Sequence, residues 1–235
     1  MEHWEALKAG GFRFVWDDAL FRPGTDTFLL SAFPRLKPRL RVCDLGSGTG
    51  LLGLLLLQRE LSLDVTGLEL QPQAAALAER CAAENGLSGR MRTLLLDLRA
   101  AKTAFPPGSF DLAVSNPPYF PPGQGALPAA EALRLARSET ACTLEDVVHA
   151  AAHLVRWGGA FCMVQKPERL TDALCALREG GCEPKRARFV VPRWTAAPSL
   201  VLLEGRRGGK PGLSIEPPLC LEDREALDRI YFRTP

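Results

Sequence analysis

The chain has 235 residues, 46% of them hydrophobic and 24% charged, a balance typical of a protein that buries a sizeable core. The formal net charge of +2 excludes a polybasic coat, so any nucleic acid would have to bind a local patch. The seven cysteines are odd in number and form no Cys-x-x-Cys pair, which argues against a disulfide framework or a zinc site. The first residues lack a signal-peptide pattern, and the apolar run from Leu51 to Leu57 is too short to span a membrane. We therefore expect a cytoplasmic protein with reduced thiols, no bound metal and no membrane segment.

The first predicted element is a short helix. Gly24 is followed by Thr25 and Asp26, whose residue types cap helices, and then by the apolar residues Phe28 to Leu30. The pattern predicts a helix start with Thr25 or Asp26 as the N-cap.

Apolar runs then alternate with helical patterns, which is typical of a parallel sheet in an α/β protein. The predicted strands are Arg41 to Asp44, Asp64 to Glu69, Met91 to Leu96, Phe110 to Ser115 and Ala160 to Gln165. The predicted helices are Leu51 to Arg59, Pro72 to Asn85, Thr143 to Trp157 and Glu168 to Arg178. Two last runs, Arg186 to Val191 and Pro198 to Leu203, are predicted to form a hairpin-like final pair.

Local signals set the expected ends of the later elements. Thr143 with Asp146 has the pattern of a capping box, and the pair Gly158-Gly159 is predicted to end the helix that begins there. Two segments rich in glycine and proline, Pro121 to Gly125 and Gly205 to Pro218, are predicted to be loops.

Positively charged residues gather in the last third of the chain. They are Lys185, Arg186, Arg188, Arg193, Arg206, Arg207 and Lys210. We expect them to concentrate positive potential on one edge of the fold, as either a solvated rim or an RNA-binding surface.

The segment from Val42 to Gly50 reads as a strand that runs into a glycine-rich turn and a helix N-terminus. Its loop glycines are Gly46, Gly48 and Gly50. Such a turn lets backbone N–H groups approach a nucleotide-like ligand closely. The spacing from Gly48 to Gly53, followed by Glu69 as a ribose-binding acid, also satisfies the dinucleotide fingerprint, so hydride transfer stays open at this point.

The tetrapeptide Asn116-Pro117-Pro118-Tyr119 directly follows the strand that ends at Ser115. The side-chain oxygen of Asn116 and the carbonyl of Pro117 can accept the two hydrogens of a planar amine, whose lone pair is otherwise delocalised into its ring. Pro118 holds Pro117 extended, and Tyr119 offers a flat surface to a heterocycle. The alternative is a proline-rich turn that ends the strand.

Two acidic residues, Asp44 and Asp97, and the Asn116 tetrapeptide favour a different ligand from a dinucleotide. Asp44 precedes the first loop glycine, where a carboxylate attracts an ammonium group but would repel a pyrophosphate. Glu69 is placed for ribose hydroxyls, and Asp97 with Leu98 for an adenine. With the Asn116 tetrapeptide, this set fits S-adenosylmethionine, whose product is S-adenosylhomocysteine. Taken singly, Asp97 is equally a helix cap and Glu69 a strand-end charge.

These motifs resemble those of class I S-adenosylmethionine-dependent methyltransferases that modify amino groups. More narrowly, three segments resemble the bacterial tRNA adenine-N6 methyltransferases that act in the anticodon loop of a valine tRNA. The three segments are Gly11 to Phe14, Arg22 to Leu30 and Ala136 to Glu139. The resemblance extends roughly from Gly11 to Leu203.

The resemblance implies an α/β, Rossmann-like class I methyltransferase fold. Its sheet would be mostly parallel and seven-stranded, with helices on both faces and an antiparallel C-terminal strand. Residues 1–38 would be an N-terminal extension packed near the cofactor pocket, residues 39–205 the methyltransferase domain, and residues 206–235 a C-terminal tail.

The resemblance also implies further binding residues. Thr25 and Asn116 would lie against the cofactor. The substrate would contact Pro118, Tyr119, Phe120 and Arg137. In the simpler interpretation, Thr25 only starts a helix and Arg137 pairs with Glu139 near the surface.

We therefore expect N6-methylation of an adenine in RNA, most specifically in a tRNA anticodon loop. Other amino-group substrates stay open: guanine N2 of ribosomal RNA, adenine in DNA, or a protein glutamine amide. A protein glutamine methyltransferase usually carries a separate helical domain, for which the residues before Val42 leave little room. A non-catalytic RNA-binding module is the alternative from another class, and the oligomeric state is not specified.

Overall fold

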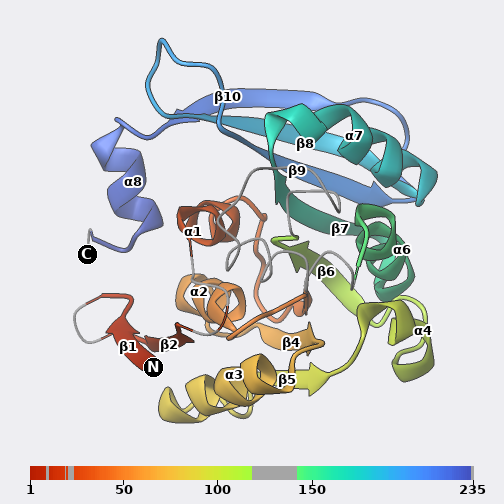
Figure 1. The fold of residues 1–235 in the computed structure, drawn as a ribbon. Helices are drawn as coiled ribbons and strands as arrows, with labels where there is room; N and C mark the ends of the chain where they lie inside the picture. The colour runs from red at the N-terminus through yellow and green to blue at the C-terminus, as the bar shows by residue number, and fades with distance from the viewer. Residues whose placement is uncertain (9–10, 19, 21–23, 118–141, 234–235) are drawn as a thin grey trace.

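A computed structural model describes residues 1–8, 11–18, 20, 24–117 and 142–233. Within these ranges, eight strands form one sheet with helices on both of its faces (Figure 1). The strand order is β10-β8-β9-β7-β6-β3-β4-β5. A separate antiparallel pair, β1 (Glu2–Ala6) with β2 (Arg13–Asp17), lies beside the helices α2 and α3.

The strands of the large sheet are β3 (Arg41–Leu45), β4 (Asp64–Glu69), β5 (Met91–Leu95), β6 (Phe110–Ser115), β7 (Val155–Gln165), β8 (Cys182–Val191), β9 (Leu200–Arg207) and β10 (Ser214–Cys220). The α-helices are α1 (Thr25–Ser31), α2 (Leu51–Arg59), α3 (Pro72–Glu84), α4 (Ala101–Ala104), α6 (Leu144–Leu154), α7 (Leu170–Glu179) and α8 (Arg224–Ile230). Two 3₁₀ turns, η1 (Leu98–Ala100) and η2 (Pro167–Arg169), complete the described elements.

The strands β3 to β7 all run in the same direction. In the middle of the sheet β3 pairs in parallel with β4 and β6, and the outer neighbours β5 and β7 continue this pattern. Their carboxyl ends therefore meet at one edge of the sheet, which we call the carboxyl edge. Only β9 runs the other way, between β7 and β8.

The core divides into two layers because alternate residues of each strand point to opposite faces of the sheet. Val42 and Val114 pack with α1, α2 and α3, whereas Cys43 and Ala113 pack with α6 and α7. Every residue of α2 from Leu51 to Leu57 is buried. Burial of a leucine side chain stabilises the folded state by about 1.5 to 3 kcal/mol. The helix α2 therefore contributes much of the stability of the layer that contains α1, α2 and α3.

Most sequence-based elements are confirmed, with three corrections. The sheet has eight strands within the described residues, not seven, because Ser214–Cys220 forms β10 in a segment predicted to be a loop. The helix expected from Thr143 to Trp157 ends at Leu154, and β7 begins at once, so Gly158 lies inside a strand. The N-cap of α1 is Gly24, and no side chain of the described residues caps that helix.

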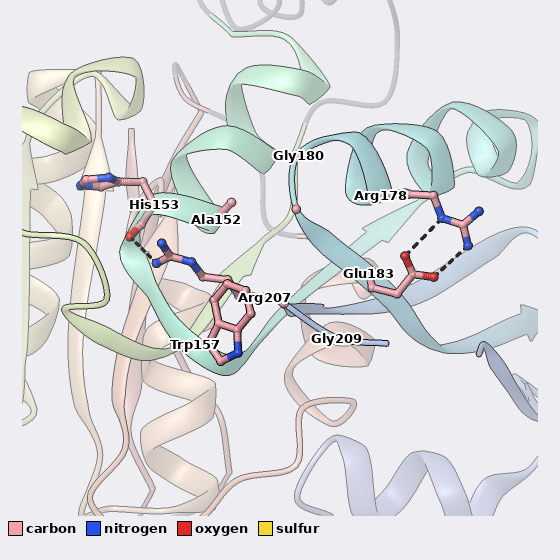
Figure 2. Close-up of a pocket in the computed structure, with 10 residues that line it drawn as sticks. Ala152, His153, Trp157, Arg178, Gly180, Glu183, Arg207 and Gly209 are labelled. Atoms are coloured by element: carbon pink, nitrogen blue, oxygen red, sulfur yellow. Dashed lines mark hydrogen bonds and ion pairs between the residues drawn. The ribbon is translucent and has the colours of Figure 1, made fainter. Parts of the chain in front are cut away.

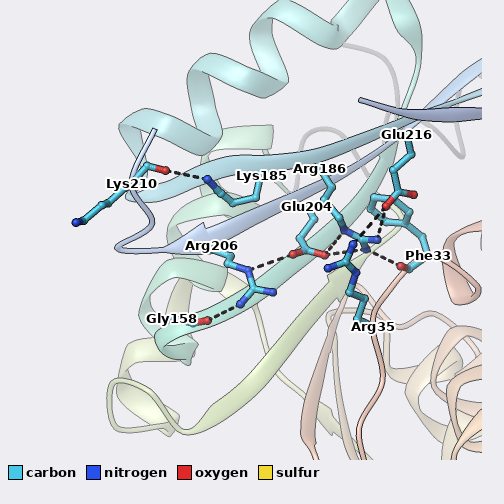
Figure 3. A network of polar contacts seen from close by, with 9 residues as sticks. All are labelled: Phe33, Arg35, Gly158, Lys185, Arg186, Glu204, Arg206, Lys210 and Glu216. Carbon is cyan, nitrogen blue, oxygen red and sulfur yellow. Dashed lines mark hydrogen bonds and ion pairs between the residues drawn. The ribbon is translucent and has the colours of Figure 1, made fainter. Parts of the chain in front are cut away.

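The short helix α1 is anchored through the segment that follows it. Arg186 on β8 is only 8% exposed, and its guanidinium donates to Glu204 on β9, to Glu216 on β10 and to the carbonyl of Phe33, over distances of 2.8, 2.8 and 2.7 Å. The same guanidinium lies 4.3 Å from the centre of the Phe33 ring (Figure 3). Removing one partner of a buried, ion-paired guanidinium of this kind is costly, because it leaves an uncompensated buried charge. The guanidinium therefore fixes the segment after α1 against three strands.

Candidate functional site

The glycine loop connects the carboxyl end of β3 to the first turn of α2. Gly50 is the N-cap of α2, with a φ of +83°, and a Cβ there would collide with the side chain of Met91. Gly48 also has a positive φ, +55°, but a Cβ there would meet no atom of the described residues within 4 Å. The loop is thus tightly packed where it enters the helix and open where a ligand would approach its backbone.

Asp44 lies beneath this loop and is 2% exposed. Burial, and then the negative charge of Glu69, raise the pKa of its carboxyl group to about 7, although a backbone hydrogen bond from Gly53 works in the opposite direction. Its Oδ2 has no hydrogen-bond partner among the described residues, and neither has the buried Oγ of Ser47. Because buried polar atoms are nearly always paired, these two atoms indicate a place that a polar ligand completes. A cationic group fits Asp44 best, since it favours the ionised carboxylate.

Glu69 ends β4 and is 7% exposed. One carboxylate oxygen accepts from the backbone N–H of Gly48 and the other from that of Gln71, each over 2.8 Å. The carbonyl of Leu68 accepts from the N–H groups of Gly46 and Ser47 over 2.9 and 3.1 Å. The end of β4 therefore holds the glycine loop in place from one side.

Asp97 follows β5 and caps the turn η1. Its side chain accepts from the backbone N–H of Arg99 over 2.9 Å and also pairs with the Arg99 guanidinium. The hydrogen bonds from Arg99 lower the pKa of Asp97. The structure thus confirms the helix-cap interpretation of Asp97. Its contact with an adenine, together with that of the partly buried Leu98, stays a prediction.

At the end of β6, Asn116 is half-buried and Pro117 is buried. The preceding residue, Ser115, donates from its hydroxyl to the carbonyl of Leu45 over 2.8 Å, which joins the ends of β6 and β3. The side-chain amide nitrogen of Asn116 donates to the hydroxyl of Thr27 on α1 over 3.1 Å. Asn116 is therefore brought next to the strand that leads into the glycine loop.

Sequence reasoning missed Thr27. It selected Thr25, which is the exposed first residue of α1, whereas Thr27 is 7% exposed and points toward β6. Residues two places apart along a helix face different sides, and no local signal indicates which of the two faces Asn116, because Asn116 lies on another element. The predicted substrate residues lie outside the described ranges, and so does the loop from Pro121 to Gly125. These substrate residues are Pro118, Tyr119, Phe120 and Arg137.

The basic stretch does not form one edge, contrary to the sequence-based expectation. Arg186 is buried in the network described above, and Arg188 donates to the carbonyl of Pro217. Arg207 donates to carbonyls at the end of α6. Arg193 lies apart from these, exposed in the connection between β8 and β9 at the carboxyl edge. Three residues of the stretch are therefore held by the fold, and Arg193 lies at the end where Asn116 lies.

A cavity of about 450 Å³ lies away from these residues, near the start of β7 and the end of β9. Trp157, His153 and Arg207 line it, and Arg207 donates to the carbonyl of His153 over 3.1 Å (Figure 2). Because this is the amino end of β7, the cavity lies at the edge of the sheet opposite to Asn116. Of the predicted site residues that the structure describes, none lines it.

Within the described ranges, no group of three or more histidine, cysteine, aspartate or glutamate side chains has the arrangement of a metal site. No helix in the same ranges has the length and apolar character needed to cross a membrane.

Comparison with known proteins supplies the family. A family model described as a methyltransferase small domain matches residues 20–179. A protein of Dickeya chrysanthemi named tRNA1(Val) (adenine(37)-N6)-methyltransferase is 33% identical over 216 residues, which cover 89% of this chain and 84% of that protein. A protein of Tolumonas auensis with the same name is 31% identical over 215 residues, covering 91% of this chain and 87% of that protein.

Solved structures support the fold. A protein of Agrobacterium tumefaciens described as a predicted O-methyltransferase superposes with a TM-score of 0.71 at 20% identity, over 88% of this chain and 96% of that one. The geranyl diphosphate C-methyltransferase of Streptomyces coelicolor A3(2), solved with S-adenosyl-L-homocysteine, gives a TM-score of 0.56 at 16% identity, over 77% of this chain and 78% of that one. The expected Rossmann-like α/β methyltransferase fold is thereby confirmed.

Proposed function

The chain belongs to the family of methyltransferase small domains, and on this premise we propose that it transfers a methyl group from S-adenosylmethionine to the N6 amine of an adenine in RNA. The position of Asn116 carries this proposal. The hydrogen bond from Ser115 to the carbonyl of Leu45 brings the end of β6, and so the Asn116 amide, beside the end of the strand that enters the glycine loop. The same amide donates to Thr27 on α1. The names of the relatives direct the substrate toward tRNA, and more finely toward the anticodon-loop adenine of a valine tRNA.

The residues around the glycine loop fit the cofactor. The unpaired Oδ2 of Asp44 suits the ammonium group of the methionine part, and the open backbone at Gly48 suits the close approach of the ligand. We assign Glu69 to the ribose hydroxyls, and Asp97 with Leu98 to the adenine. When bound, S-adenosylmethionine supplies an electrophilic methyl group on a sulfonium.

Asn116 and Pro117 have the central role in the proposed reaction. The Asn116 oxygen and the Pro117 carbonyl accept hydrogen bonds from the two hydrogens of the substrate amine, which frees its lone pair for attack through nitrogen. Positive charge grows on that nitrogen as the bond forms, and the same two oxygens stabilise it. No strong base is needed, because the proton leaves after transfer. Orientation of the two reactants supplies most of the rate, for which effective molarities correspond to about 7 to 11 kcal/mol.

RNA would approach along the carboxyl edge. Arg193 and Trp194 are exposed there, Trp194 at 62%, in the connection between β8 and β9. A cation next to an aromatic face suits a flexible RNA segment, which offers phosphates and unstacked bases. Tyr119, outside the described residues, would stack on the target base. An adenine in a loop is a more accessible target than a paired adenine, because less free energy is needed to unstack it.

The chain divides into three segments in this proposal. We propose that residues 1–38 form an extension near the cofactor pocket, residues 39–205 the methyltransferase domain, and residues 206–235 a tail that adds β10 and α8. The location that accompanies a tRNA substrate is the cytoplasm. The seven cysteines, all free thiols, are compatible with it.

Nucleoside analysis tests the proposal directly. RNA from a deletion strain should lack one N6-methyladenosine, and plasmid-borne wild-type protein should restore it where Asn116→Ala does not. In vitro, tritiated methyl groups from S-adenosylmethionine should enter RNA. Label in protein alone would instead support a glutamine methyltransferase, and label in neither, a non-catalytic RNA-binding module.

A further inference from the structure

The hydroxyl of Thr27 meets the Asn116 amide across 89 residues of chain. Thr27 is 7% exposed, so its side chain is enclosed by the fold, whereas Asn116 is half-buried at the sheet edge. The amide nitrogen of Asn116 is the donor in this contact, so the amide oxygen lies on the opposite edge of the planar amide group.

The helix that carries Thr27 is fixed at its far end by groups from other elements. Arg59 on α2 donates to the hydroxyl of Ser31 over 3.0 Å, and Arg186 on β8 donates to the carbonyl of Phe33 over 2.7 Å. The Phe28 ring stacks on Tyr231, with centroids 4.9 Å apart. Thr27 therefore presents its hydroxyl from a helix that cannot shift without breaking buried contacts.

Asparagine needs such a partner at this position. Its last side-chain torsion has a broad, roughly two-fold profile, so packing alone holds the amide plane loosely. If the amide turned over, its NH₂ group would face the hydrogens of the substrate amine, and the hydrogen bond required for transfer would be lost. Small misplacement of a reacting or orienting group costs up to about 100-fold in rate.

We propose that Thr27 is a positioning residue, which holds the Asn116 amide so that its oxygen, and not its nitrogen, meets the substrate amine. This inference rests on the proposed function, because it needs Asn116 to orient that amine. It adds a residue outside the Asn116 tetrapeptide to the machinery of transfer. It also gives α1 a role in turnover that is distinct from cofactor binding.

Thr27→Val removes the hydroxyl and keeps the branched shape, and Thr27→Ser keeps the hydroxyl. The matched control is Thr66→Val, because Thr66 is 1% exposed on β4 and its hydroxyl accepts from Arg92 over 3.1 Å. For each variant we would measure turnover on RNA at saturating cofactor, cofactor affinity by calorimetry, and thermal stability. Asn116→Ala and the double variant Thr27→Val/Asn116→Ala complete a double-mutant cycle.

Thr27→Val should lower turnover about tenfold or more with cofactor affinity unchanged, while Thr27→Ser restores it and Thr66→Val leaves it intact. The double variant should be no slower than Asn116→Ala, because Thr27 acts through Asn116. Wild-type turnover in Thr27→Val, or additive losses in the double variant, would overturn the role of Thr27 alone. Wild-type turnover in Asn116→Ala would instead overturn the proposed mechanism.

Discussion

The carboxylate of Glu69 accepts a hydrogen bond of 2.8 Å from the backbone N–H of Gly48, so the end of β4 directly holds the glycine loop that follows β3. The other carboxylate oxygen accepts from Gln71 over the same distance. We also assign Glu69 to the ribose hydroxyls of the cofactor. The conformation of the glycine loop and the binding of the ribose would therefore both depend on this one carboxylate.

Glu69→Gln should weaken cofactor binding by about tenfold or more, because a hydrogen bond to a charged group contributes about 1.5 to 3 kcal/mol and the new amide brings a donor toward an N–H group. Calorimetric titration with S-adenosylmethionine measures this loss. Glu84→Gln is the control, since Glu84 is an exposed acid on α3 that pairs with Arg13. Equal affinities for both variants would contradict the role of Glu69.

The free energy of unfolding should depend on pH through Asp44. Its pKa is raised from 3.8 to about 7, so the folded state binds the proton more tightly than the unfolded state. The contribution to stability is therefore complete below about 3.8 and is lost as the pH rises through about 7. Chemical denaturation of wild type and Asp44→Asn across this range should show the decline in wild type alone.

Cofactor affinity should change with pH in the opposite sense. The ionised form of Asp44 attracts an ammonium group, so affinity should rise as the pH passes through about 7. Calorimetry in buffers of different ionisation enthalpy should detect proton release on binding in wild type. Asp44→Asn should bind weakly with a flat profile, and a flat profile in wild type would refute this assignment.

Gly50→Ala should destabilise the protein more than Gly86→Ala. Both glycines have a positive φ, +83° and +67°, so an alanine at either pays about 1 to 2 kcal/mol for a left-handed backbone. Only at Gly50 would the new Cβ also collide with Met91, whereas at Gly86 it meets nothing within 4 Å. Urea denaturation measures the loss in free energy of unfolding for each variant, and the difference between the two losses is the cost of the collision with Met91. Indistinguishable urea midpoints for the two variants would mean that the loop relaxes around the methyl group.

Trp194→Ala should raise the KM for RNA and leave cofactor affinity unchanged. Stacking of one base on an aromatic side chain contributes about 1 to 3 kcal/mol, which corresponds to at least a fivefold change. Trp157→Ala is the matched control, because Trp157 is 74% exposed but lies near the start of β7, at the opposite edge. Arg193→Ala should reduce the salt dependence of RNA binding by about one phosphate contact. Equal changes in the KM for RNA in the two tryptophan variants would contradict the assignment of the carboxyl edge as the RNA-binding surface.

The elements with strong local signals could be predicted residue by residue. The helix α2 and the strands β4 and β6 have the expected bounds, because short, mostly apolar runs bounded by polar, charged, glycine or proline residues define their ends. The capping box at Thr143 and Asp146 is present as expected. These features depend on neighbours in sequence, which a single chain reveals.

The features that were missed depend on distant partners. The strand β10 contains Pro217 and Pro218, which argue against a central strand, yet it lies at the sheet edge and pairs only with β8, where proline is tolerated. The early end of α6 reflects pairing of Val155 with Phe110, which no local signal at Gly158 discloses. Thr27 was missed for the same reason, since its partner Asn116 lies on another element.

The hydrogen bond of 2.8 Å from Arg59 to the carbonyl of Ile230 joins residues 171 positions apart. A ribosome adds about 5 to 20 residues per second, so α2 leaves it roughly 10 to 30 seconds before its partner in α8 is made. Arg59 therefore gains this partner only after 230 of the 235 residues have been added.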